Sequence, residues 1–160
     1  MALVLTVNTD SWNRQVDALA TSVAGLVPVV KGNGYGFGRD WLAERAASFA
    51  SHVAVGTVFE VSSVPAQCTP VVLTPSLDIP AGLRDDAILT VGSMTHIEAL
   101  TATNKSRQVV VKIRSSMNRY GCAVGGRAAT SRVPGGRPRR RARRGPWSRS
   151  KWRPCLRSLR

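Results

Sequence analysis

Short apolar runs recur along the first 113 residues of this 160-residue chain, separated by segments whose apolar side chains have helical spacing. Each run is rich in Val, Ile or Leu and is five to seven residues long, as buried β-strands are. Uninterrupted apolar strands are typical of parallel sheets that helices cover on both faces. The alternation therefore predicts an α/β fold, either an open doubly wound sheet or part of a (β/α)8 barrel. We expect six strands, at residues 3–7, 26–30, 52–58, 70–74, 87–91 and 109–113.

Helical segments are expected in most of the intervals between these strands. Residues 9–24 and 39–50 carry apolar side chains at helical spacing. Ser93 is placed to cap a helix that runs through Ala102, and residues 59–64 fit a short helical turn. Each predicted helix follows a predicted strand, which is the rhythm of repeated βα units.

Charge divides the chain at about residue 121. Residues 1–121 contain ten Lys and Arg and nine Asp and Glu, whereas residues 122–160 contain thirteen Lys and Arg and no acid. The formal net charge of +14 therefore belongs almost entirely to the second part. The sequence predicts a near-neutral globular domain over residues 1–121. It predicts a disordered basic tail over residues 122–160, because that part lacks an apolar period and repels itself.

Other sequence features bear on the cellular compartment and on metal binding. No secretory signal and no membrane-spanning run is visible. The three cysteines form neither a CxxC pair nor a disulfide framework. His52 and His96 have no Cys, Asp or Glu at metal-ligand spacing. We therefore expect a cytoplasmic protein without a metal site.

Lys31 and a glycine-rich loop follow the second predicted strand. Glycine occupies positions 32, 34, 36 and 38, with neither GxGxxG spacing nor the lysine position of a Walker loop. A partly buried lysine at the carboxyl end of a parallel strand can lose its proton and form a Schiff base with an aldehyde. The residue types alone equally allow a lysine that extends its amine into water.

Two stretches resemble the motifs of a known enzyme family. The stretch 29-VVKGNGYGFG-38 resembles V-K-A-N-A-Y-G-H-G, the cofactor signature of alanine racemases, and 109-VVVKIRSSMNRYG-121 is similar to the K-x-D-T-G-M-x-R-x-G segment of that family. The resemblance covers residues 3–121. It implies the N-terminal part of a TIM-type (β/α)8 barrel that binds pyridoxal 5′-phosphate (PLP). It also implies racemisation of an amino acid, L-alanine/D-alanine or a related substrate, by a homodimeric enzyme.

The resemblance assigns roles to five residues. Lys31 would hold the cofactor covalently and act as one of two proton-transfer bases. Tyr35 would line the cofactor site near the phosphate. Arg119 would bind the cofactor's phenolic oxygen and the substrate carboxylate, and Met117 would contact that carboxylate through its backbone. Lys112 matches a lysine that is carbamylated in many family members and that helps to position the arginine.

The sequence departs from the family pattern in two ways. Arg114-Ser115-Ser116 replaces the Asp-Thr-Gly of the motif, which reverses a charge and points to a substrate other than alanine. A barrel of this type needs about 250 residues, and the family adds a C-terminal β-domain that carries the second base, a tyrosine. The sequence therefore predicts a truncated and inactive piece of the racemase fold.

The tail has two interpretations. Its narrow residue alphabet, without Asp, Glu, Asn, Gln, Ile, Phe, Tyr, His or Met, is typical of GC-rich codons read in the wrong frame, and we favour this interpretation. The alternative is a functional nucleic-acid-binding arm. Residues 138–144 would then neutralise phosphates, and Trp147 and Trp152 would stack on bases.

The nucleotide sequence after the Gly121 codon separates these interpretations. We expect another reading frame there to encode further barrel strands, a histidine-bearing loop and a β-domain. Sequencing of the genomic region checks this. A tail that related genes keep as protein in the present frame would contradict the frame interpretation and favour the basic arm.

Overall fold

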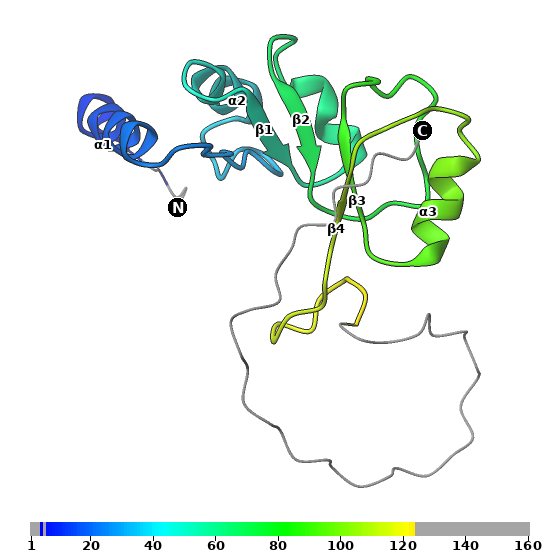
Figure 1. Ribbon diagram of the computed structural model, residues 1–160. Helices are drawn as coiled ribbons and strands as arrows, with labels where there is room; N and C mark the ends of the chain where they lie inside the picture. The colour runs from blue at the N-terminus through cyan, green and yellow to red at the C-terminus, as the bar shows by residue number, and fades with distance from the viewer. Residues whose placement is uncertain (1–3, 5, 124–160) are drawn as a thin grey trace, which may run out of the picture. The chain divides into compact units, whose positions relative to one another are not determined.

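A parallel four-stranded sheet forms the centre of the part of the chain that the structure describes, residue 4 and residues 6–123 (Figure 1). The structure is a computed structural model. The strands lie in chain order, and each pairs in parallel with the strand before it. The predicted α/β fold with a parallel sheet is thus confirmed. The strands are β1 (His52–Val55), β2 (Thr69–Val72), β3 (Ile88–Val91) and β4 (Val109–Val111).

Two predicted strands do not form as expected. The segment 26–30 makes only an isolated bridge between Val29 and Ala54, because Pro28 has no N–H to donate and the glycine-rich loop begins directly after Val30. The strand predicted at residues 3–7 lies partly outside the described residues, and its described members belong to no strand. The other four predicted strands form within three residues of their expected bounds.

Helices connect the strands less regularly than the βα rhythm predicts. Asn8 caps the first helix, since its Oδ1 accepts a hydrogen bond of 2.9 Å from the N–H of Ser11. Residues 73–87, between β2 and β3, contain no helix. None of the helices in the described residues is long and apolar enough to cross a membrane. The helical elements are α1 (Thr9–Ser22), α2 (Arg39–Ala47), the 3₁₀-helix η1 (Val58–Ser63) and α3 (Met94–Thr101).

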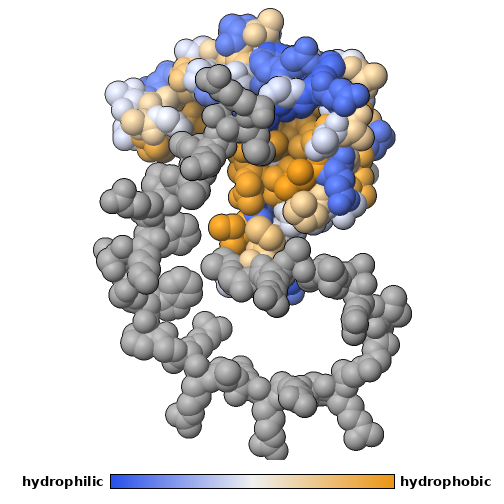
Figure 2. All heavy atoms as spheres, turned by 45° about the vertical axis from the view of Figure 1, so that its right-hand side comes forward, coloured by the Kyte–Doolittle hydropathy of each residue, from blue (hydrophilic) through white to orange (hydrophobic). Residues whose placement is uncertain are grey.

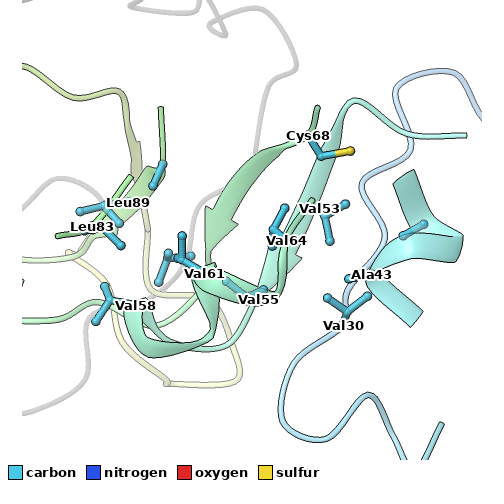
Figure 3. Close-up of a cluster of buried hydrophobic side chains, with 13 residues drawn as sticks. Val30, Ala43, Val53, Val55, Val58, Val61, Val64, Cys68, Leu83 and Leu89 are labelled. Atoms are coloured by element: carbon cyan, nitrogen blue, oxygen red, sulfur yellow. The ribbon is translucent and has the colours of Figure 1, made fainter. Parts of the chain in front are cut away.

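A small core of valine and alanine side chains holds these elements together (Figure 3). Helix α2 buries Ala43 and Ala46 beside Val30 and the β1 valines, so small side chains bring the helix close to the sheet. Helix α1 and strand β4 contribute no buried residue. The core therefore covers β1 to β3 and leaves the β4 edge exposed. Its members are Val30, Ala43, Ala46, Val53, Val55, Val58, Val61, Val64, Cys68, Val72, Leu83, Ala87 and Leu89.

Two arginines bind backbone carbonyls around the connection between β2 and β3, which contains no helix. The Arg84 guanidinium donates hydrogen bonds to the carbonyls of Val64 (2.8 Å) and Cys68 (2.7 Å) and to the carboxylate of Asp86 (2.7 Å). The Arg107 side chain, 3% exposed, donates to the carbonyls of Leu83 (3.0 Å) and Arg84. Charged donors thus satisfy backbone carbonyls on both sides of β2, at Val64 and Cys68 before it and at Leu83 and Arg84 after it.

The basic tail lies outside this description. Residues 124–160 are not among the described residues, so the disordered tail predicted over residues 122–160 remains a prediction. The same holds for the nucleic-acid interpretation, because residues 138–144, Trp147 and Trp152 all belong to that segment.

Acid should weaken the Arg84–Asp86 ion pair. The hydrogen bond from Arg84 is the main cause that lowers the pKa of Asp86. A lowered folded-state pKa stabilises the fold above the unfolded-state pKa of about 4, and this stabilisation is lost as the pH falls through the folded-state pKa. We expect Asp86→Asn to reduce the free energy of unfolding by less than about 1 kcal/mol at pH 7, and to have no effect near pH 2.

Urea unfolding at both pH values measures this difference. Asp78→Asn is the matched control, because Asp78 is exposed and no hydrogen bond or ion pair of its carboxylate is present among the described residues. A destabilisation by Asp86→Asn that is equal at both pH values would contradict the ion-pair explanation.

The exposed β4 edge should make the chain self-associate. Val109, Val110 and Val111 are 42%, 46% and 60% exposed, and Figure 2 shows hydrophobic side chains (orange) gathered at the surface of the described part. An apolar edge strand of this kind pairs readily with other chains unless a charge interrupts it. We expect Val111→Lys to reduce association, measured by light scattering over a concentration series. Val23→Lys, at an exposed valine beyond α1, should leave association unchanged. A monomeric unmodified chain at all concentrations would refute this expectation.

Candidate functional site

Lys31 lies at the carboxyl end of the bridging segment, next to the end of β1. The N–H of Val30 donates to the carbonyl of Ala54 (2.8 Å), and the N–H of Ala54 donates to the carbonyl of Pro28 (2.8 Å). This pairing places the Cβ of Lys31 only 3.2 Å from the position that a Cβ at Gly56 would occupy. Lys31 itself is exposed. The backbone of Lys31 is therefore fixed against the sheet while its side chain remains accessible.

The glycine-rich loop after Lys31 turns tightly into α2. Gly34 is buried with φ +67°, and a Cβ there would lie 2.7 Å from the carbonyl oxygen of Gly38, so only glycine fits. Asn33 stabilises the turn because its Oδ1 accepts the N–H of Gly36 (3.1 Å). By contrast, Cβ atoms at positions 32, 36 and 38 would meet nothing within 4 Å. The loop is thus closed internally at Gly34 and open on its outer side.

Tyr35 lies in the same loop. Its φ of +55° is unusual for a residue with a side chain, and the side chain is 58% exposed. Phe37, two residues further on, packs against Trp12 of α1 and Trp41 of α2, with ring centroids 5.6 and 6.0 Å away. The aromatic cluster anchors the far end of the loop, and Tyr35 projects from its middle.

Side chains from η1 and α2 hold the first residue of the loop. The Oε2 atom of Glu60 accepts the N–H of Gly32 (3.3 Å) and the N–H of Gly56 (2.7 Å). The Arg39 guanidinium donates to the carbonyl of Gly32 (3.0 Å) and to the Oγ of Ser63 (2.8 Å). The sequence motifs predict no role for Glu60, Arg39 or Ser63. The sequence feature that could have indicated Glu60 is its position as an isolated acidic residue four residues after Gly56.

A second cluster follows β4. The N–H of Lys112 donates to the carbonyl of Val91 (2.8 Å), which extends the β3–β4 pairing by one residue. The N–H of Cys122 donates to the carbonyl of Lys112 (3.0 Å), which closes the loop between them. Lys112 Nζ and the guanidinium carbon of Arg119 lie 5.8 and 5.9 Å from the centre of the same Tyr120 ring. The structure thus places Lys112 and Arg119 near the same aromatic ring.

The structure brings the predicted site residues together in two groups. Lys31 and Tyr35 lie beside β1, whereas Lys112 and Arg119 follow β4 at the other edge of the sheet. Met117 is 70% exposed, and its N–H contacts the Oγ of Ser115 (3.4 Å). Both groups follow the ends of parallel strands and so lie at the carboxyl end of the sheet. Within residues 6–123, no hydrogen bond or ion pair joins the two groups.

Three further reactive side chains, Cys68, His52 and His96, make contacts within the fold. Cys68 is buried, which raises the pKa of its thiol, and its Sγ contacts the carbonyl of Ala50 (3.2 Å). His52 and His96 pair with the hydroxyls of Ser51 (3.0 Å) and Ser93 (2.7 Å). In residues 6–123, no three His, Cys, Asp or Glu side chains lie close enough to hold a metal ion.

Comparison with known proteins identifies the family. The family model described as "Alanine racemase, N-terminal domain" matches residues 7–131. No curated protein matches the chain. The matched range includes the Lys31 loop and the segment with Lys112, Met117 and Arg119, and the domain boundary at Gly121 remains a prediction. Since the match covers well over half of the sequence, the chain belongs to the family of the alanine racemase N-terminal domain.

Proposed function

We propose that residues 6–121 are the first part of a (β/α)8 barrel that binds PLP through Lys31. The observation that carries this proposal is the position of Lys31: an exposed lysine whose backbone is fixed at the carboxyl end of a parallel sheet, beside an open loop. Active sites of (β/α)8 barrels lie at this end of the strands. Lysines that bond covalently to carbonyl groups of cofactors need both accessibility and a fixed position.

The strand order supports a barrel over a doubly wound sheet. Doubly wound sheets reverse their strand order at a switch point, where the ligand binds. The four strands described here follow one another without reversal, as successive strands of a (β/α)8 barrel do. We propose that β4 and the segment 28–30 are the two edges at which such a barrel continues.

The residues present fit the cofactor. The outer side of the loop is open at Gly32, Gly36 and Gly38, which leaves room for a flat ring beside Lys31. When bound, PLP withdraws electrons from the substrate α-carbon and makes its proton acidic. On this proposal the Lys31 amine holds the cofactor and carries a proton to or from that carbon. Tyr35 lies beside the cofactor.

The second cluster would bind the substrate. Arg119 offers planar paired donors that suit a carboxylate, and Lys112 contacts the same Tyr120 ring. Met117 would contribute its backbone. The substrate class is therefore an amino acid, alanine or a relative. Arg114 adds a positive charge to the same loop and favours a substrate other than alanine.

We further propose that the 160-residue chain does not racemise amino acids by itself. The described residues supply four strands and one bridging segment, fewer than the eight strands of a (β/α)8 barrel, so the set of groups that would surround a substrate there is incomplete. Reaction at a single carbon requires the groups that hold the substrate and the groups that move its proton to converge within hydrogen-bond reach.

Labelling with PLP and borohydride tests the assignment of Lys31. The lysine amine forms a bond to the aldehyde carbon with loss of water, and borohydride supplies the hydride that makes this bond permanent. We expect peptide mapping to find the pyridoxyl group mainly on Lys31 and much less on Lys105, whose amine is paired with Asp85 (2.8 Å). Lys31→Ala should abolish this label, and Lys105→Ala should not.

Two results would overturn these proposals separately. A pyridoxyl group on Lys105 or Lys112 with Lys31 unmodified would reject the cofactor assignment. Racemisation of alanine or another amino acid above background by the unmodified chain would reject the proposed inactivity and leave the cofactor assignment standing.

A further inference from the structure

We propose that Glu60 is a positioning residue for Lys31, acting through the backbone on both sides of Gly32. This inference rests on the proposed function, because it concerns the lysine that would hold PLP. Glu60 does not touch the Lys31 amine in the described structure. Its carboxylate instead accepts the N–H of Gly32, which belongs to the peptide group that joins Lys31 to the loop.

The peptide groups on both sides of Gly32 are held by charged side chains. Glu60 accepts the Gly32 N–H (3.3 Å), and Arg39 donates to the Gly32 carbonyl (3.0 Å). Gly32 has φ +65°. A glycine without such contacts moves freely between several backbone conformations. Two charge-assisted hydrogen bonds therefore restrict the residue that most affects the direction of the Lys31 backbone.

The geometry of η1 explains why these side chains reach the loop. A 3₁₀-helix has three residues per turn, so Glu60 and Ser63 lie one above the other on the same side. Val58, Val61 and Val64 have the same spacing on another side and are buried in the core. The valines fix the helix to the sheet, and Glu60 and Ser63 face the loop. The position of the loop is thus set by the core.

Gly56 brings Glu60 and Lys31 together. Its N–H donates to Glu60 Oε2 (2.7 Å), and a Cβ on Gly56 would lie 3.1 and 3.2 Å from the Glu60 carboxylate oxygens and 3.2 Å from the Lys31 Cβ. The absence of a side chain at this position lets one carboxylate bind the backbone of two adjacent segments. Glu60 thereby ties the Lys31 segment to the end of β1.

Three variants separate positioning from a general structural effect. Glu60→Ala removes the acceptor of both N–H groups. Glu60→Gln keeps an oxygen that can accept both bonds and should preserve the position of Lys31. Glu98→Ala is the matched control, because Glu98 is an exposed glutamate on α3, the helix that follows another strand of the sheet.

The experiment uses the full chain and two measurements. Amide hydrogen exchange by NMR reports whether the Gly32 and Gly56 N–H groups are held, without any cofactor. PLP with borohydride, followed by peptide mapping, gives the ratio of label on Lys31 to label on Lys105. We expect Glu60→Ala to speed exchange at both glycines and to lower the label ratio, each about tenfold, as expected for a lost hydrogen bond. Glu60→Gln and Glu98→Ala should match the unmodified chain.

The outcomes distinguish this inference from the proposed function. If the unmodified chain is labelled on Lys31 and Glu60→Ala is labelled equally, Glu60 does not position the lysine, while the cofactor assignment stands. If the unmodified chain is not labelled on Lys31, the cofactor assignment fails and this inference fails with it. If Glu60→Ala does not fold, Arg39→Gln decides, because it removes the bond to the other side of Gly32. A lower label ratio for Arg39→Gln supports positioning, and an unchanged ratio overturns it.

Discussion

The close packing of small aliphatic side chains around β1 determines where α2, η1 and the segment before the Lys31 loop lie. Val53 and Val55 are fully buried, and Val30 and Ala43 pack against them from the bridging segment and α2. Because the contact is made by valine and alanine, helix and strand approach closely, and a larger residue here would push them apart. The same layer holds η1 through Val58 and Val61. The loop after Lys31 is therefore flanked by elements that a single core fixes.

The sequence predicts the framework because the framework depends on local pattern. The runs at residues 52–58, 70–74, 87–91 and 109–113 are β-branched and uninterrupted, and all four form strands of one parallel sheet. The segment 26–30 has the same composition but becomes a single bridge, since Pro28 interrupts the hydrogen-bond ladder. The connection from β2 to β3 contains no helix, and Arg84 within it binds the carbonyls of Val64 and Cys68, which precede β2. Such a long-range interaction leaves no periodic trace in the sequence.

Only those residues of the candidate site that belong to a sequence motif can be predicted from the sequence. Lys31 and Arg119 are recognisable from their neighbours in sequence, but their separation across the sheet is not, because it depends on how many strands lie between them. No sequence motif identifies Glu60. Its contacts reach 28 residues back in the sequence to Gly32 and four residues back to Gly56, and nothing in the segment 57–63 distinguishes a backbone acceptor from a solvated glutamate.

The order of strands in the sheet also has a consequence for how the domain folds while it is synthesised. Each strand pairs with the strand that precedes it in the chain, and the bridging segment 28–30 pairs with β1. Pairings between successive segments close shorter loops than pairings between distant strands do, so they cost less chain entropy. When each strand leaves the ribosome, its partner has already emerged. The sheet can therefore grow by one strand at a time in the direction of translation, with β4 as the growing edge.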